Sequence, residues 1–428
     1  MWHFGLFPLT LVLGLLARAE AQGAPELPSN DEFYKPPSGW AEKELGDILA
    51  RRPVSIVSEH IPDYEAWQLL YVTQDLYEQK TTSVTTIIVP QGANTSRILS
   101  YQIAYDSPDV NCSPSYGLQP GANEAAIPFT QGQMNYIAEI LRDDAPPVLN
   151  IPDYEGSNAA FTVGPQSAYQ TLDSIRAATR SGETTGIDEG AEIVLFGYSG
   201  GAYASEWAVE LHGDCCAEDV NIIGAAIGGP PTNIIKTYRN VNVFVYPPLN
   251  VWAMLGVMNA IPEINDFMEG DLKPEHKRKF LQRRERCSEP DEPFEEILPF
   301  SNISNWFVQG DYFLTKFEPE LTEIGVLGNH ISEENPPTFP LYIFQGGLDA
   351  VTMPLNDTVA LKAKFCDAGT PVFMKVYTLR DHLGAADVGS PPAMEWIRAV
   401  FNGEEIETNC AGSFAEDSAA DVLGGVAQ

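Results

Sequence analysis

The chain has 428 residues, and 44% of them are hydrophobic, which is enough for one large domain with insertions or for two ordinary domains. It carries 59 acidic residues against 25 basic ones, a net charge of −34. This balance argues against a nucleic-acid partner and against broad electrostatic attraction to anionic membranes.

The N-terminus has the pattern of a secretory signal peptide. The apolar run at 4–17 is too short to cross a bilayer, and Ala19 and Ala21 stand in a small-x-small arrangement before Gln22. Positive charge ahead of this run is limited to the α-amino group and His3. We expect a signal peptide at residues 1–21 and a secreted, monomeric chain at 22–428, with no integral membrane span.

Cysteines and glycosylation sequons agree with export. Six cysteines can pair in an oxidising compartment. Four Asn-x-Ser/Thr sequons predict N-glycosylation at Asn94, Asn111, Asn302 and Asn356.

Strand and helix patterns alternate along the chain. Buried strands are predicted at 83–89, 98–105, 147–151, 191–197, 224–227, 340–345 and 372–377, and helices at 159–180, 202–212, 249–260 and 393–401. Such alternation implies an α/β fold with a mostly parallel sheet.

The connection after residue 228 is too long for an ordinary loop. We expect a helical cap or lid inserted at about 228–335. It contains a basic run, 273–286, which is interpreted first as a solvated helix face and alternatively as a hinge or orienting patch beside a lipid surface.

The most informative motif is G-x-S-x-G at Gly197, Tyr198, Ser199, Gly200 and Gly201, between a predicted strand and a predicted helix. Serine on such a sharp turn, flanked by glycines that allow close backbone approach, is typical of a nucleophile elbow. The alternative is a glycine-rich loop in which Ser199 only caps the helix.

A serine nucleophile needs a histidine base and an acid that orients it. Among the histidines, only His382 follows two further predicted strands, in a loop before the last helix. Asp349 follows the strand at 340–345 and is the expected acid. The alternatives are that Asp349 only caps a helix and that Asp381 or Asp387 is the acid. The order Ser199, Asp349, His382 is that of α/β-hydrolases.

Two backbone N–H groups are expected to hold the oxyanion. One belongs to Gly200, immediately after the serine, and the other is assigned to Asp106, which follows an earlier predicted strand. The alternative is that Asp106 only begins an Asx turn. This chemistry implies no metal and no cofactor.

Several longer segments together carry a family resemblance. FYKPPSGW (33–40), NCSPSYG (111–117), NIPDYEGSNAAF (150–161), FGYSGGAYASEWA (196–208) and GGLDAVTMP (346–354) resemble the fungal secretory lipases of the lipase A type, over about residues 33 to 410. The resemblance implies an α/β-hydrolase core with a large helical cap and hydrolysis of acylglycerols or related esters. The expected partner is an ester or acylglycerol substrate, in solution or at a lipid–water interface. It implies Ser199 as nucleophile, Asp349 as acid, His382 as base, and Asp106 and Gly200 at the oxyanion hole.

The same resemblance implies disulfides Cys112–Cys287 and Cys366–Cys410. Cys215 and Cys216 are left over, and we expect two reduced, partly buried thiols because a bond between neighbours is strained. The favoured function is a triacylglycerol lipase. The alternatives are a short-chain or acetyl esterase of a secondary metabolite, an acyltransferase, a serine peptidase, and an inactive hydrolase fold that binds a partner.

Overall fold

The computed structural model describes residues 24–57, 59–61, 63–122, 127–242, 247–287, 301–351 and 354–417. The expected signal peptide lies outside these residues. No helix within the described ranges is long and apolar enough to cross a membrane.

Ten strands of the described chain form one sheet, in the order β1-β2-β3-β5-β4-β6-β7-β8-β9-β10. The strands are β1 (Ile48–Pro53), β2 (Tyr64–Gln74), β3 (Lys80–Pro90), β4 (Asn94–Gln102), β5 (Pro147–Pro152), β6 (Glu192–Tyr198), β7 (Ile222–Gly228), β8 (Leu341–Gly346), β9 (Val372–Tyr377) and β10 (Ala415–Glu416). The first three strands and the β3–β5 pair are antiparallel. Every pair from β5 to β10 is parallel, so the strands that lead to the predicted site residues end at the same edge.

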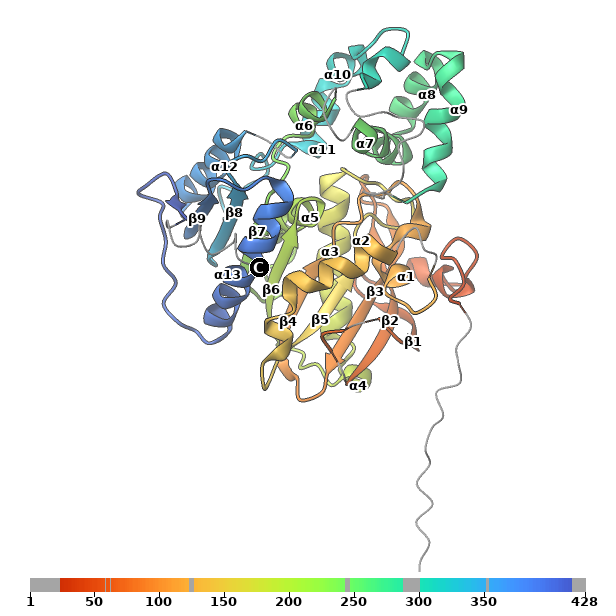
Figure 1. Cartoon of the computed structure of the whole chain (residues 1–428). Coiled ribbons are helices and arrows are strands. Elements are labelled where there is room, and N and C mark those ends of the chain that lie inside the picture. The colour runs from red at the N-terminus through yellow and green to blue at the C-terminus, as the bar shows by residue number, and fades with distance from the viewer. Residues whose placement is uncertain are drawn as a thin grey trace, which may run out of the picture.

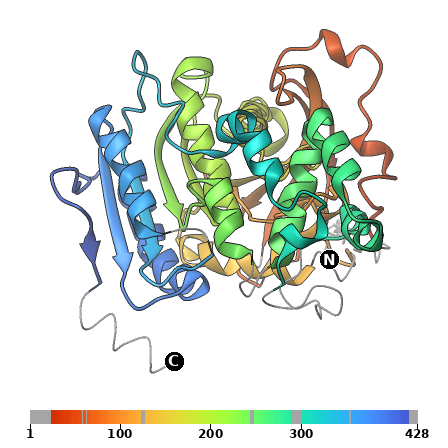
Figure 2. The same ribbon diagram turned by 90° about the horizontal axis from the view of Figure 1, so that it is seen from above.

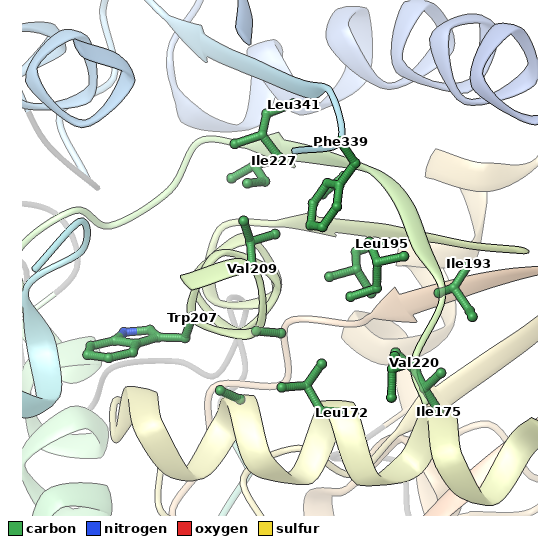
Figure 3. Packing of buried hydrophobic residues seen from close by; sticks show 14 of the residues in the cluster. Leu172, Ile175, Ile193, Leu195, Trp207, Val209, Val220, Ile227, Phe339 and Leu341 are labelled. Atoms are coloured by element: carbon green, nitrogen blue, oxygen red, sulfur yellow. The ribbon is translucent and has the colours of Figure 1, made fainter. Parts of the chain in front are cut away.

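Helices cover both faces of the sheet. One face packs against α3 (Gly164–Thr179), α5 (Gly200–Cys215) and α12 (Leu355–Asp367). The other packs against α13 (His382–Phe401) and η4 (Gln133–Ile137). Figure 3 shows the first core, where Leu172 of α3 and Val209 of α5 meet Leu195 of β6. Because apolar side chains pack against both faces of β6, every residue of this strand except Glu192 is buried.

The segment between β7 and β8 is a helical insertion. It comprises α6 (Ile234–Val241), α7 (Pro247–Ala260), α8 (Pro262–Asp271), α9 (Pro274–Leu281), η6 (Gln282–Glu285), η7 (Ile303–Trp306), α10 (Tyr312–Lys316) and α11 (Glu318–Gly325). These helices have a core of their own, which includes Leu255, Phe280 and Phe307. They lie above the edge at which the parallel strands end, as seen from the side in Figure 1 and from above in Figure 2.

Short elements fill the remaining connections. They are η1 (Glu32–Tyr34), η2 (Trp40–Glu42), η3 (Val110–Cys112), α1 (Pro114–Gly117), α2 (Ile127–Gly132), η5 (Ile140–Arg142) and α4 (Gly182–Thr185).

The predicted fold class is confirmed, and each of the seven predicted strands is present within a few residues. Two expectations about elements differ from the structure. The antiparallel strands β1 and β2 were not predicted, and α13 begins at His382 rather than at residue 393. Pro391 and Pro392 lie inside α13, so the prolines do not mark its start.

Candidate active site

Ser199 occupies a strained turn between β6 and α5. Its φ of 55° and ψ of −122° lie in a region that non-glycine residues rarely adopt. The flanking positions need glycine because backbone atoms of other residues lie too close for a side chain. A Cβ on Gly197 would lie 2.2 Å from the Gly201 carbonyl oxygen, and one on Gly201 would lie 1.9 Å from the Gln102 carbonyl oxygen. The pentapeptide therefore forms the predicted elbow and not an open loop.

His382 lies between the serine and Asp349. Its Nε2 is 2.9 Å from Ser199 Oγ, and its Nδ1 is 2.7 Å from Asp349 Oδ2. His382 is 8% exposed and Asp349 9% exposed, so water hardly competes for these contacts. The expected loop position of His382 is wrong, because His382 is the first residue of α13. Asp381 caps this helix by accepting a hydrogen bond from the Gly384 N–H.

The rival residues have other surroundings. Asp381 and Asp387 are exposed. The remaining histidines after Ser199 contact other groups: His212 bonds the Val220 carbonyl, His276 stacks on Trp306, and His330 packs against Trp207. His382 is thus the histidine that contacts the Ser199 hydroxyl, and Asp349 is the carboxylate that contacts His382.

The predicted oxyanion residues also lie together. Gly200 is the first residue of α5, where helix N–H groups have no intrahelical acceptor. A Cβ on Gly200 would lie 1.9 Å from Asp106 Oδ1, so the Asp106 side chain packs directly over the glycine. Within the described residues the Asp106 N–H donates to no backbone oxygen, and the residue has a φ of 44°. Asp106 thus contacts the residue that follows Ser199, and its N–H has no backbone acceptor within the described residues.

Buried carboxyl groups surround this loop. Burial raises the pKa of Asp106 to about 7, although the charge of His382 opposes the shift. Burial likewise raises the pKa of Asp153 to about 7 and that of Glu155 well above its usual range. No role for Asp153 or Glu155 is predicted from the sequence. A signal was present, because both acidic residues lie within three residues of the end of a strand that is buried at every position.

The structure contains the two disulfides that the resemblance implies, Cys112–Cys287 and Cys366–Cys410. The expectation of two reduced thiols is wrong, since Cys215 and Cys216 are bonded to each other. They lie where α5 ends, and Cys216 departs from helical geometry with a φ of −143°. The backbone therefore leaves the helical conformation at Cys216, where the bond between the two neighbouring cysteines forms.

The basic run at 273–286 forms α9 and η6 of the insertion. Arg278 and Arg286 are exposed, in agreement with a solvated face, but Arg283 is 3% exposed and lies 5.9 Å from the Trp252 ring centroid. The expectation of a solvated face is therefore wrong for Arg283, whose side chain is buried over the Trp252 ring.

An apolar pocket of about 40 Å³ opens inside the insertion. Its lining comes from α6, α7, α8, α10 and α11, and includes Met254, Met268 and Leu321. Thr162 lines it as well, and the Thr162 carbonyl accepts a hydrogen bond from Tyr203 on the elbow helix. The pocket therefore borders the element that carries Ser199.

The chain is similar to known lipases and esterases. Residues 123–409 match the family model described as secretory lipase. Lipase A of Arthroderma benhamiae is 34% identical over 91% of this chain and 83% of its own length. Trichothecene C-3 esterase of Fusarium sporotrichioides is 30% identical over 96% and 92%. The crystal structure of Candida antarctica lipase A has a TM-score of 0.81 at 25% identity and covers 94% of both chains.

These relatives share ester hydrolysis and extend over nearly the whole chain. The chain is therefore a carboxylic ester hydrolase and belongs to the secretory lipase family.

Proposed function

We propose that the protein is a secreted, monomeric triacylglycerol lipase that works through Ser199, His382 and Asp349. The observation that carries the proposal is the single imidazole with one nitrogen 2.9 Å from the serine oxygen and the other 2.7 Å from a buried carboxylate. Asp349 holds the Nδ1 proton, which leaves Nε2 free to accept the proton of the Ser199 hydroxyl.

The reaction has two steps. Ser199 Oγ attacks the ester carbonyl while His382 takes its proton, and His382 then gives that proton to the leaving alcohol. Water, deprotonated by His382, next attacks the acyl-enzyme; the fatty acid leaves, and His382 returns the proton to Ser199 Oγ. The N–H groups of Asp106 and Gly200 donate to the carbonyl oxygen as it becomes negative, which is worth about 3 kcal/mol per donor.

Replacing the nucleophile tests this assignment. Ser199→Ala should lower kcat for p-nitrophenyl esters on the order of 10⁶-fold. A fluorophosphonate should label the wild type at Ser199, as read by peptide mass mapping, and should not label the variant. Retention of most activity in the variant would exclude Ser199 as the nucleophile.

Three observations favour a neutral lipid as substrate. The apolar pocket lies among the helices above the site. Three leucines near Asp349 and His382 in sequence are exposed: Leu348 by 59%, Leu379 by 61% and Leu383 by 54%. The net charge of −34 disfavours an anionic surface. Leucines beside the catalytic acid and base suit contact with an uncharged lipid–water interface.

The second candidate is an esterase of small acetylated metabolites, which the similarity to a trichothecene C-3 esterase favours. A series of acyl esters from acetyl to long chain, in solution and as emulsions, separates the two. A lipase should prefer long chains above their solubility limit, whereas strict preference for acetyl esters would establish the esterase. A peptide-amide substrate tests the serine peptidase, and an alcohol acceptor tests the acyltransferase.

Secretion is proposed from the signal segment, the three disulfides and the sequons. Asn356 is exposed on α12, and Asn94, Asn111 and Asn302 are half-buried. The natural host should export a chain that begins at Gln22. Treatment with a peptide N-glycosidase should reduce its mass, and Asn356→Gln should remove one glycan.

A further inference from the structure

The backbone at Asp106 has a conformation that needs outside support. Its φ of 44° lies in the left-handed region, which costs free energy for a residue with a Cβ. Such a conformation persists only where neighbouring groups hold it in place. The direction of the Asp106 N–H depends on this conformation.

One residue bonds both neighbours of Asp106. The Glu155 N–H donates to the Tyr105 hydroxyl at 2.7 Å, and Glu155 Oε2 accepts from the Ser107 N–H at 3.3 Å. Glu155 is completely buried, so these bonds face no competition from water. Glu155 therefore bonds Tyr105 through its backbone and Ser107 through its side chain, on either side of Asp106.

Glu155 is itself held rigidly. Its carbonyl accepts hydrogen bonds from the Ala160 N–H and from Gln166 Nε2, both at 2.9 Å. Gln166 belongs to the first turn of α3, which packs against the elbow helix α5. The support of Asp106 therefore runs back to the helix pair that also fixes Ser199.

The surroundings of the Glu155 carboxyl favour its neutral, protonated form. Its Oε1 has no hydrogen-bond partner, and burial together with the neighbouring Asp106 raises the pKa of Glu155 well above its usual range. A neutral amide at this position would retain an oxygen to accept from Ser107.

We infer that Glu155 is a positioning residue that holds the Asp106 N–H in line with the carbonyl oxygen of the reacting ester. The inference rests on the proposed function, in which that N–H is an oxyanion donor. Glu155 touches neither the substrate nor the reacting atoms, so its effect passes through the conformation of residues 105–107.

Two substitutions separate positioning from packing. Glu155→Gln keeps the acceptor for Ser107, whereas Glu155→Leu keeps most of the volume and removes the acceptor. On a soluble p-nitrophenyl ester, Glu155→Leu should lower kcat by about 10- to 100-fold with KM within about 3-fold, since an oxyanion donor acts in the transition state. Glu155→Gln should stay within about 3-fold of the wild type in both parameters.

A transition-state analogue gives a second measurement. A trifluoromethyl ketone forms a tetrahedral oxyanion on the serine, so its inhibition constant should rise with the loss of kcat in Glu155→Leu and remain unchanged in Glu155→Gln. Glu206→Leu, which removes another completely buried carboxyl outside this loop, is the matched control and should leave kcat and the inhibition constant unchanged at 25 °C.

The outcomes distinguish this inference from the proposed function. If Ser199→Ala stays active, the proposed function fails, whatever the Glu155 variants do. If Ser199→Ala is inactive but Glu155→Leu, folded by circular dichroism, keeps its kcat and its inhibition constant, only the positioning role is excluded. Equal loss of kcat in the Gln and Leu variants would also overturn it.

Discussion

The His382 ring joins the loop that carries Asp349 to the elbow, and Asp349 decides which ring nitrogen carries the proton. Asp349→Asn keeps the size of the side chain but offers an N–H that can face Nδ1, which favours the wrong tautomer. We expect kcat to fall by about 10⁴-fold with little change in stability. Steady-state kinetics with a soluble ester measures the loss, and activity within tenfold of wild type would contradict the role of Asp349.

Replacing Gly201 of the elbow by alanine should lower the free energy of unfolding much more than replacing an exposed glycine. Gly201→Ala would place a methyl group 1.9 Å from a backbone oxygen, so β4 and α5 must separate. We expect a loss of more than about 4 kcal/mol in the free energy of unfolding. Gly190→Ala is the control, because its Cβ would meet no atom within 4 Å. Denaturant titration of both variants checks the difference.

At the residue scale, the sequence predicted which side chains meet but not what supports them. Ser199, Asp349 and His382 could be predicted because each follows a strand of a parallel sheet, and such ends share one edge. The contacts of Glu155 depend on how a loop folds back over Tyr105 and Ser107, which no periodicity records. The bond between Cys215 and Cys216 depends on a local turn at the end of α5.

At the scale of elements, α5 joins the elbow to the end of the inserted helices. Glu210 of α5 is buried and accepts hydrogen bonds from the N–H groups of Gly328 and His330, just beyond α11. Tyr203 on the same helix donates to the Ile324 carbonyl at the end of α11. The elbow helix therefore also anchors the chain where it leaves the insertion.

Glu210 and Glu206 should differ in their effect on stability. Glu210→Ala leaves two backbone N–H groups without acceptors and should cost about 2 to 6 kcal/mol. Glu206→Gln removes a carboxyl whose pKa is raised by burial and by Glu210, and should be neutral or stabilising at pH 7. Urea unfolding at pH 7 compares the two variants, and equal destabilisation would contradict this account.

The elements that were predicted are the apolar ones. β6 and β8 are buried at nearly every position, so their sequences are continuously hydrophobic. The edge strand β1 contains two arginines and a proline, and its neighbour β2 buries Gln68, which bonds Arg52 and the Ser115 carbonyl. These polar contacts form only between segments distant in sequence. The polar residues that make them interrupt the hydrophobic pattern by which a strand is predicted.

For the whole molecule, buried carboxyl groups set the dependence of stability on pH. In the folded state the pKa of Asp106 and of Asp153 is about 7, whereas unfolded carboxyls titrate near 4. The folded state thus keeps protons that the unfolded state releases as pH rises. Their stabilising effect is complete below about pH 4 and is lost as pH approaches 7, on the order of 4 kcal/mol per group.

We therefore expect the melting temperature to fall as pH rises from 4 to 8, which calorimetry at matched ionic strength measures. Asp153→Asn retains an acceptor for the Ser115 N–H and removes the titration, so its melting temperature should depend less steeply on pH. A variant that follows the wild-type slope would show that Asp153 does not contribute to it.

The Cys112–Cys287 disulfide also places a lower limit on how soon a newly made molecule can be completed. Its two cysteines are 175 residues apart, and this interval contains the elbow and much of the insertion. At 5–20 residues per second, a ribosome needs roughly 9 to 35 s to make that interval. A chain still being synthesised therefore contains Ser199 before it contains the Cys287 thiol, and the disulfide can form only after α6 to η6 of the insertion have been translated.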